Sequence, residues 1–250
     1  MIFLQTDPKV SRRRVGRQLF ALGVLTASLL SAANASAQTQ TTLGNLNNSN
    51  GANPYAGLLV DANGHLFGTT SSGGSGFGTV FKLALTPTGY ASTPTTLVSF
   101  NYINGAGPLA TLIADANGNL FGTTYGGGVF GAGTVFEVVN TATGYSTTPT
   151  TLFSFNQSNG ATPYAGLIAD ANGNLFGTTH LGGLFGAGTV FELVRTATGY
   201  ATAPTTLVNF NNNTGAYPYA GLIADANGNL FGTTSSSASG YGTVSNSPGR

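Results

Sequence analysis

The sequence predicts an all-β fold, namely a β-propeller of about four four-stranded blades. Three observations lead to this fold class. One phrase recurs four times at nearly constant spacing, and the complete copies each hold four short runs rich in β-branched and aromatic residues. These runs are separated by Gly, Asn and Pro, and none has the apolar period of an amphipathic helix. Four-stranded repeats of roughly 40–50 residues are typical of propeller blades.

The repeat is marked by one phrase in each copy, DANGHLFGTT once and DANGNLFGTT three times. The leading aspartates are 54, 55 and 55 residues apart, and they are Asp61, Asp115, Asp170 and Asp225. Downstream come GTVFKL, GTVFEV or GTVFEL, followed by TTLVSF, TTLFSF or TTLVNF. We therefore expect a single β-repeat domain over 38–250, with repeats near 48–101, 102–156, 157–211 and 212–244.

The expected strands of the second repeat are 111–115, 119–124, 133–139 and 150–155. The Asp-Ala-Asn-Gly sequence between the first two favours a tight turn, because Asp can cap a turn and Asn and Gly tolerate positive φ. These two strands should therefore be antiparallel neighbours. A glycine lies inside each FGTT run, where it predicts the close approach of another backbone; these are Gly68, Gly122, Gly177 and Gly232.

The two ends of the repeat region are complementary. The sequence from Thr41 to Asn47 resembles the fourth strand of a repeat, although it precedes the first complete copy. The last copy begins a third strand at Gly242–Val244 and has no fourth strand. We expect Thr41–Leu46 to pair with the strand around Thr243, so that the N-terminal strand closes the last blade and no long sheet edge is left open. The alternative is an open β-repeat array.

The first 37 residues read as a signal peptide. A basic segment with Arg12–Arg14 precedes an apolar run from Leu19 to Leu30, and Ala35-Ser36-Ala37 supplies a small-residue cleavage site. The apolar run is too short to cross a bilayer, so we expect no membrane span. The predicted location is extracellular or periplasmic, and the export route stays open because Arg12-Arg13 resembles a twin-arginine signal.

Composition excludes several function classes. Beyond residue 37 the basic residues are Lys82, Arg195 and Arg250, against six acidic residues, so a basic surface for nucleic acid is absent. There is no cysteine, and thus no disulfide frame or thiolate chemistry. We expect no cofactor.

No catalytic group of residues is predicted. Glu137 and Glu192 align with Lys82, so this position is expected at the solvated rim of the strands. A triad needs a positioned histidine, but His65 falls in a turn and His180 in a variable loop. No metal site is predicted either, with one alternative: the four aspartates that begin the phrase could ring one mouth of the propeller and hold Ca²⁺. The simpler interpretation is that each caps its own hairpin.

Successive strands run in opposite directions, so the loops fall at the two ends of the strands and define two sides of the domain. The Gly-rich loops and the connections between repeats lie on one side, and the Asp-Ala-Asn-Gly turns and the Gly-Tyr linkers lie on the other. The first side combines tyrosines with amides and carries almost no charge, which suits stacking and hydrogen bonding to neutral glycans. Its candidate binding residues are Tyr55, Tyr125, Tyr164, His180 and Tyr219. The alternative is that the tyrosines after proline only pack between blades.

The succession NGAxPYAGL, DANGNLFGTT, GTVFEL and TTLxSF resembles the Gloeobacter/Verrucomicrobium-type tandem repeat of the choice-of-anchor GloVer-containing proteins, over about residues 41–244. This resemblance implies a bacterial extracytoplasmic repeat protein without a defined activity. Together with the residues, it favours a secreted non-enzymatic binding or scaffold module that recognises an extracellular saccharide or a cell-surface component. The alternatives are a propeller-type glycan lyase or hydrolase and a cation-stabilised structural repeat protein. The oligomeric state stays open.

Overall fold

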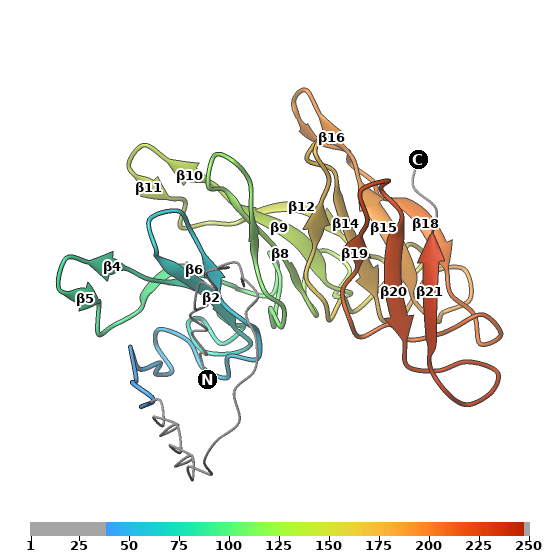
Figure 1. The fold of residues 1–250 in the computed structure, drawn as a ribbon, viewed down its shortest axis with the longest axis horizontal. Helices are drawn as coiled ribbons and strands as arrows, with labels where there is room; N and C mark the ends of the chain where they lie inside the picture. The colour runs from blue at the N-terminus through green and yellow to red at the C-terminus, as the bar shows by residue number, and fades with distance from the viewer. Residues whose placement is uncertain (1–38, 248–250) are drawn as a thin grey trace, which may run out of the picture. The chain divides into compact units, whose positions relative to one another are not determined.

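The fold of residues 39–247 is described by a computed structural model (Figure 1). The predicted signal peptide lies outside the described residues. The chain divides into two units, Met1–Gln40 and Thr41–Arg250, and every described strand belongs to the second. Strands are the only long elements of the described part, so the all-β class is confirmed. No helix among residues 39–247 is long and apolar enough to cross a membrane.

The strands form antiparallel sheets that follow the repeat, as predicted. Three sheets have four strands and share one order, in which the third strand lies between the second and the fourth. The first contains β1 (Leu59–Val60), β2 (Leu66–Thr70), β3 (Thr79–Leu83) and β6 (Thr95–Ser99). The second contains β7 (Ile113–Ala114), β8 (Leu120–Thr124), β9 (Thr134–Val138) and β12 (Thr150–Ser154). The third contains β13 (Ile168–Ala169), β14 (Leu175–Thr179), β15 (Thr189–Leu193) and β18 (Thr205–Asn209).

The fourth sheet has three strands, β19 (Ile223–Ala224), β20 (Leu230–Thr234) and β21 (Thr243–Ser247). The Gly-Tyr linkers, expected only as loops, form small hairpins between the third and fourth strands of a repeat. These hairpins are β4 (Leu85–Thr86) with β5 (Gly89–Tyr90), β10 (Asn140–Thr141) with β11 (Gly144–Tyr145), and β16 (Arg195–Thr196) with β17 (Gly199–Tyr200).

The glycine of each FGTT run is crowded by side chains rather than by backbone, which corrects the sequence-based expectation. Gly122 lies opposite Phe136 in the β8–β9 pair. A Cβ on Gly122 would lie 2.7 Å from Cζ of Phe136 and 3.0 Å from Cδ2 of Leu112. The glycine is required because the phenylalanine ring of the neighbouring strand lies across it.

Neighbouring sheets pack face to face through three apolar clusters, as the blades of a propeller do. Each cluster takes residues from two successive repeats. The first joins Phe67, Val80, Val98 and Phe100 to Leu112, Leu120, Phe136 and Val138. The second joins Phe121, Ala132, Val135 and Phe155 to Ala161, Leu167, Leu175, Phe191 and Leu193. The third joins Ala187, Val190 and Phe210 to Ala216, Leu222 and Leu230.

The predicted closure of the last blade is not found. Thr41–Leu46 forms no strand, and β21 has β20 as its single partner among the described residues. A Cβ on Gly44 would lie 3.2 Å from Cδ1 of Leu83, so this segment packs against the first sheet. The physical reason lies in β21, where Ser245 and Ser247 replace the Phe and the Leu or Val of the other repeats and leave little apolar surface to bury. Val244, on the outer face, is 83% exposed.

Candidate functional site

Four of the five predicted binding residues lie in one group of contacting rings. We define the aromatic loop cluster as Tyr125, Tyr164, His180, Tyr217 and Tyr219. The ring of Tyr164 has its centroid 5.1 Å from that of Tyr125, 5.2 Å from that of His180 and 5.0 Å from that of Tyr219. His180 in turn lies 4.2 Å from Tyr219 and 5.4 Å from Tyr217. The cluster is therefore continuous across loops of the second, third and fourth repeats.

Two kinds of segment supply these rings. Tyr125 and His180 directly follow the second strands β8 and β14, and Tyr164, Tyr217 and Tyr219 belong to the connections between repeats. The ring contacts thus bring these loops together in the second, third and fourth repeats.

A strained backbone residue sets the direction of each connection. Thr162 and Tyr217 have φ of 52° and 59°, and each stands directly before the proline that precedes the cluster tyrosine. A bulky or β-branched residue at positive φ costs of order 1 kcal/mol or more and persists only where neighbours hold it. Here the Thr162 N–H donates to the carbonyl of Ala132 at 2.8 Å, and the Tyr217 N–H donates to that of Ala187 at the same distance. Tyr217 was missed in the sequence, although its place before Pro218 was the available signal.

The surroundings of His180 favour its neutral form. Burial lowers its pKa from 6.5, and a hydrogen bond to the backbone of Pro218 offsets this only in part. Its Nδ1 atom is buried and has no hydrogen-bond partner among the described residues. Burial and the hydroxyls of Tyr125 and Tyr219 raise the pKa of Tyr164 above 10.0, so the phenol stays protonated at neutral pH.

The cluster is partly open to solvent. Tyr125 is 41% exposed and Tyr219 is 54% exposed, whereas Tyr164 and Tyr217 are intermediate. Tyr55, the remaining predicted residue, is 73% exposed and belongs to no described ring pair. Its equivalent in the second repeat is Leu109, which interrupts the row of tyrosines.

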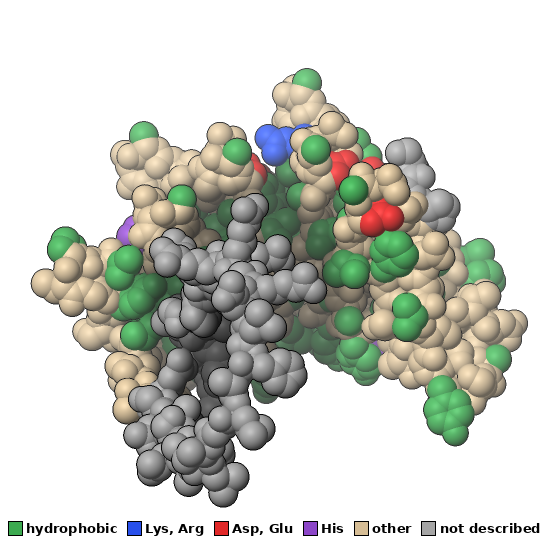
Figure 2. All heavy atoms as spheres, in the orientation of Figure 1, with side chains coloured by type: hydrophobic (Ala, Val, Ile, Leu, Met, Phe, Trp, Pro, Cys, Tyr) green, Lys and Arg blue, Asp and Glu red, His purple; other side chains and the backbone are tan. Residues whose placement is uncertain are grey.

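The Gly-rich loops expose apolar side chains that the sequence analysis did not single out. These are Val129 and Phe130 in the second repeat and Leu184 and Phe185 in the third. The available signal was the pair of apolar residues before Gly-Ala-Gly in both loops. Charged side chains are few on the face shown in Figure 2.

The four aspartates of the phrase are used by their own turns. Oδ1 of Asp115 accepts hydrogen bonds from the backbone N–H groups of Asn117 and Asn119, and Oδ2 accepts one from the Asn119 amide. Asp170 and Asp225 repeat this set, and Asp61 makes the two backbone bonds. Among residues 39–247, no three Asp, Glu or His side chains lie close enough to hold a metal ion together.

The strand acids are less solvated than expected. Glu192 is only 6% exposed, so the solvated or rim position predicted for it is wrong. Glu137 is partly buried, which is compatible with a position at the rim. Burial, followed by the charge of Asp115, raises the pKa of Glu137, and the charge of Arg195 from the following repeat opposes this shift.

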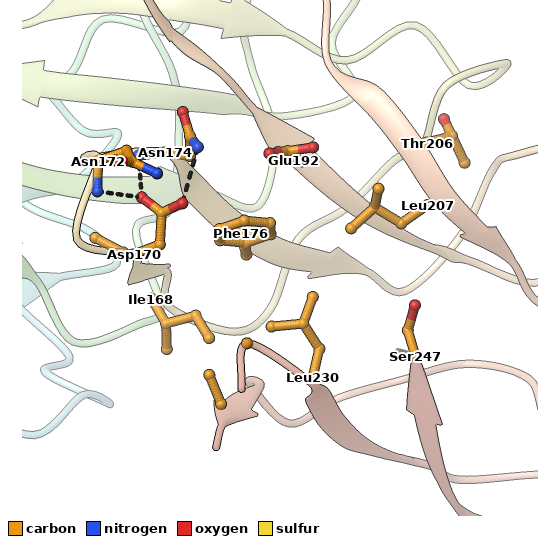
Figure 3. A pocket seen from close by; sticks show the side chains of 13 residues that line it. Ile168, Asp170, Asn172, Asn174, Phe176, Glu192, Thr206, Leu207, Leu230 and Ser247 are labelled. Atoms are coloured by element: carbon orange, nitrogen blue, oxygen red, sulfur yellow. Dashed lines mark hydrogen bonds between the residues drawn. The ribbon is translucent and has the colours of Figure 1, made fainter. Parts of the chain in front are cut away.

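A cavity of about 350 Å³ lies between the third and fourth sheets (Figure 3). Ile168, Phe176 and Glu192 line it from the third sheet, and Gly228, Leu230 and Ser247 line it from the fourth. It belongs to the side of the Asp-Ala-Asn-Gly turns, since Asp170 and Asn172 also border it. It is thus distinct from the aromatic loop cluster.

Comparison with known proteins gives one family. A model described as the Gloeobacter/Verrucomicrobia repeat matches residues 28–245. No curated protein sequence matches the chain.

Several solved structures resemble the chain. One is an ulvan lyase of a polysaccharide lyase family, at 14% identity and a TM-score of 0.47, covering 74% of this chain and 47% of the lyase. Another is an α-L-arabinofuranosidase from Podospora anserina, at 13% identity and a TM-score of 0.39, covering 80% of this chain and 64% of that enzyme. A third is an endo-arabinase from Bacteroides thetaiotaomicron, at 16% identity and a TM-score of 0.35, covering 74% of this chain and 70% of that enzyme. The chain spans about half the length of the lyase.

Proposed function

The chain belongs to the Gloeobacter/Verrucomicrobia repeat family, and we propose that it is an exported binding module that holds a neutral saccharide on the aromatic loop cluster. The observation that carries this proposal is the continuous contact among Tyr125, Tyr164, His180 and Tyr219, whose rings come from three different repeats. Rings that only packed between sheets would be covered, whereas Tyr125 and Tyr219 remain about half exposed.

The chemistry of the cluster suits a sugar ring. The C–H faces of a pyranose stack on aromatic rings, and its hydroxyls pair with phenol and amide groups. Burial lowers the pKa of His180 and so favours its neutral form, and no carboxylate belongs to the cluster, so the site suits an uncharged ligand. The contacts among the rings also fix their rotamers before binding, which lowers the entropic cost of association.

The absence of an acid pair from the cluster favours binding over turnover. Glycoside hydrolysis with two carboxylates requires them within roughly 5–10 Å of each other across the scissile bond. Export supports a saccharide partner outside the cytoplasm, and it rests on the basic and apolar segments and the small-residue site within residues 1–37.

The proposal is tested by affinity electrophoresis of the protein in gels that contain neutral polysaccharides. At least one polysaccharide should retard the parent protein. The Tyr164→Ala variant should lose roughly tenfold in affinity, the equivalent of about 1.4 kcal/mol. Tyr55→Ala is the matched control, because Tyr55 follows a proline in the same way but lies outside the cluster.

Two results would contradict the binding module. If no neutral polysaccharide retards the protein, or if Tyr55→Ala and Tyr164→Ala behave alike, the cluster is not a saccharide site. Release of reducing ends or unsaturated products at catalytic rates would instead support the alternative of a glycan hydrolase or lyase.

A further inference from the structure

Six apolar side chains are exposed at one end of the strands, where the Gly-rich loops meet the connections between repeats. Two come from the connection between the first and second repeats, and one pair comes from the tip of each Gly-rich loop in the second and third repeats. Each side chain is 48–77% exposed. We define the apolar loop surface as these residues, namely Tyr102, Ile103, Val129, Phe130, Leu184 and Phe185.

The members from the first connection and from the second repeat are adjacent in space. The carbonyl of Tyr102 accepts a hydrogen bond from the N–H of Gly128 at 2.7 Å, directly before Val129. The hydroxyl of Tyr102 lies 3.0 Å from the position that a Cβ on Gly131 would take, directly after Phe130. The connection and the loop tip therefore form one continuous apolar surface.

Hydrogen bonds fix the backbone of the two loop tips. In the third repeat, the N–H of Gly188 donates to the carbonyl of Gly182 across the base of the loop at 3.0 Å. The N–H of Leu184, at the tip, donates to Oδ1 of Asn209 at 2.8 Å. The second repeat has the same bond across the loop and a bond from its tip to Ser154. Turning the tips inward would break these bonds, so the apolar side chains stay exposed in the free protein.

The repeats supply an internal comparison for the first connection. Tyr102 and its equivalent in the next connection, Gln157, both have φ of 70°. A polar residue therefore suffices at this backbone position, where a bulky residue is unfavourable. Ile103 likewise aligns with Ser158. Exposed apolar residues that the fold of the connection does not require indicate a contact surface.

The distribution of charge indicates what this surface meets. Within residues 39–247, two basic and six acidic residues give a net charge of −4. All eight belong to the Asp-Ala-Asn-Gly turns, the third strands or the Gly-Tyr hairpins, towards the opposite ends of the strands. The Gly-rich loops and the connections contain no Asp, Glu, Lys or Arg. The apolar loop surface is thus complementary to an uncharged partner, and the acidic residues oppose attraction to an anionic one.

We propose that the apolar loop surface inserts into the interfacial region of an uncharged lipid bilayer. A bilayer offers a plane that receives tips from separate repeats at the same time. Ile103, Val129 and Leu184 favour lipid over a glycan, because sugars stack on flat aromatic rings, whereas aliphatic side chains gain free energy from burial in hydrocarbon. Insertion of this kind depends on buried apolar area and needs no basic residues.

The first experiment is cosedimentation of the full chain with vesicles of pure phosphatidylcholine. The double variant Phe130→Ala/Phe185→Ala should bind at least roughly tenfold more weakly than the parent, because it loses two apolar side chains from the bilayer. The matched control is Val60→Ala/Ile223→Ala, which removes side chains that are 61% and 69% exposed near the Asp-Ala-Asn-Gly turns. It should bind like the parent.

The difference between the two double variants decides the result, because the apolar run from Leu19 to Leu30 belongs to every protein compared. Both variants truncate exposed side chains, so their melting temperatures should match that of the parent. Tyr164→Ala removes a ring of the aromatic loop cluster and no member of the apolar loop surface, so it should bind vesicles like the parent. The lipid surface and the saccharide site are thus tested separately.

The second experiment uses fluorescence. The chain contains no tryptophan, so Phe130→Trp and Val60→Trp each introduce a single reporter at a known position. Phosphatidylcholine vesicles should shift the emission of Phe130→Trp to shorter wavelength, since the indole leaves water, and should leave that of Val60→Trp unchanged.

Three results would overturn the proposal. The first is equal binding of vesicles by the two double variants, and the second is an unchanged emission of Phe130→Trp. The third is binding that requires phosphatidylglycerol and is lost at high salt, which would indicate electrostatic attraction instead of insertion. Cosedimentation with an insoluble polysaccharide but not with vesicles would assign the surface to a glycan and would also overturn the proposal.

Discussion

At the residue scale, one glycine in each of the first three repeats accommodates one phenylalanine ring. Gly68, Gly122 and Gly177 each lie under the ring of their cross-strand partner, at virtual Cβ distances of 2.5–2.7 Å from Cζ. In the fourth repeat the partner is Ser245, and Gly232 keeps only the contact with Leu222 at 3.0 Å. The same residue type therefore has different neighbours in different copies of the repeat.

This difference allows a matched test. Gly122→Ala should destabilise the protein by about 1–3 kcal/mol, because the added methyl overpacks a site that Phe136 already fills. Gly232→Ala should cost clearly less, since no ring lies over it. Equilibrium denaturation of the two variants gives the comparison, and equal losses would show that the ring is not what requires the glycine.

His180 makes stability depend on pH. Its pKa in the folded protein is lowered below 6.5 by burial, so the folded state binds the proton less readily than the unfolded state. The stabilisation is fully present above pH 6.5 and is lost as the pH falls through the lowered pKa. The melting temperature should therefore drop between pH 7.5 and 5, and the drop should be smaller in His180→Ser, which carries the residue of the first and fourth repeats. An identical drop in both proteins would exclude His180 as the cause.

At the element scale, the Asp-Ala-Asn-Gly turn joins the first two strands and also holds the Gly-Tyr hairpin. The Oδ1 atoms of Asn119 and Asn174 accept the N–H of the first hairpin residue, Asn140 or Arg195, at 2.9 and 2.8 Å. In the first repeat, Nδ1 of His65 accepts the corresponding N–H of Leu85 at 2.9 Å. The histidine predicted as a turn residue is thus a substitute for asparagine in this bond.

The turn gives a graded prediction. Asp115→Ala removes three hydrogen bonds and should cost about 1–2 kcal/mol, as the loss of a capping side chain does. Asp61→Ala removes only two hydrogen bonds, because His65 makes no bond to the second carboxylate oxygen. Its loss of unfolding free energy should therefore be smaller than that of Asp115→Ala by the contribution of one hydrogen bond, roughly 0.5–1.5 kcal/mol. Denaturant titration measures both losses. A melting temperature that fell on addition of EDTA would show that the aspartates hold a cation as well as their turns.

At the scale of the whole repeat unit, stability depends on the three interfaces between sheets, and the third is the least complete. Phe100 packs edge-on to Phe136 at 5.0 Å, and Phe155 to Phe191 at 5.1 Å. The equivalent pair at the third interface would be Phe210 with residue 245, which is serine. We expect the fourth sheet to open more readily than the others.

Restoring the missing ring should strengthen this interface. Ser245→Phe places an aromatic ring over Gly232 and against Phe210, with a gain of about 1–3 kcal/mol from buried apolar area and ring contact. In a domain of this size that gain raises the melting temperature by roughly 2–4 °C per kcal/mol. Ser239→Phe, on an exposed loop, serves as the control and should leave the melting temperature within error. No gain in Ser245→Phe would mean that the fourth sheet does not pack as the other three do.

Much of the fold and part of the candidate site could be predicted from the sequence, because these features depend on residues close together in the chain. Turn chemistry and strand alternation sufficed for the four-strand units, and they placed Tyr164 on the same side as Tyr125 and His180. The ring over Gly122, the burial of Glu192 and the lack of a second partner for β21 among residues 39–247 depend on packing between strands and sheets, which no short sequence pattern encodes. Tyr217 escaped notice because a tyrosine at positive φ is unfavourable by itself and is held there by its neighbours.

The most direct measurement of the saccharide site is an NMR titration of the protein labelled in its tyrosine and histidine rings, with a neutral polysaccharide that retards it in gels. The account predicts that the ring signals of Tyr125, Tyr164, His180 and Tyr219 shift together. It also predicts that the ring signals of the Gly-Tyr hairpin tyrosines stay unchanged, because these rings lie at the opposite ends of the strands. These tyrosines are Tyr90, Tyr145 and Tyr200. Shifts confined to the hairpin tyrosines, or no shift in the cluster at saturating saccharide, would contradict it.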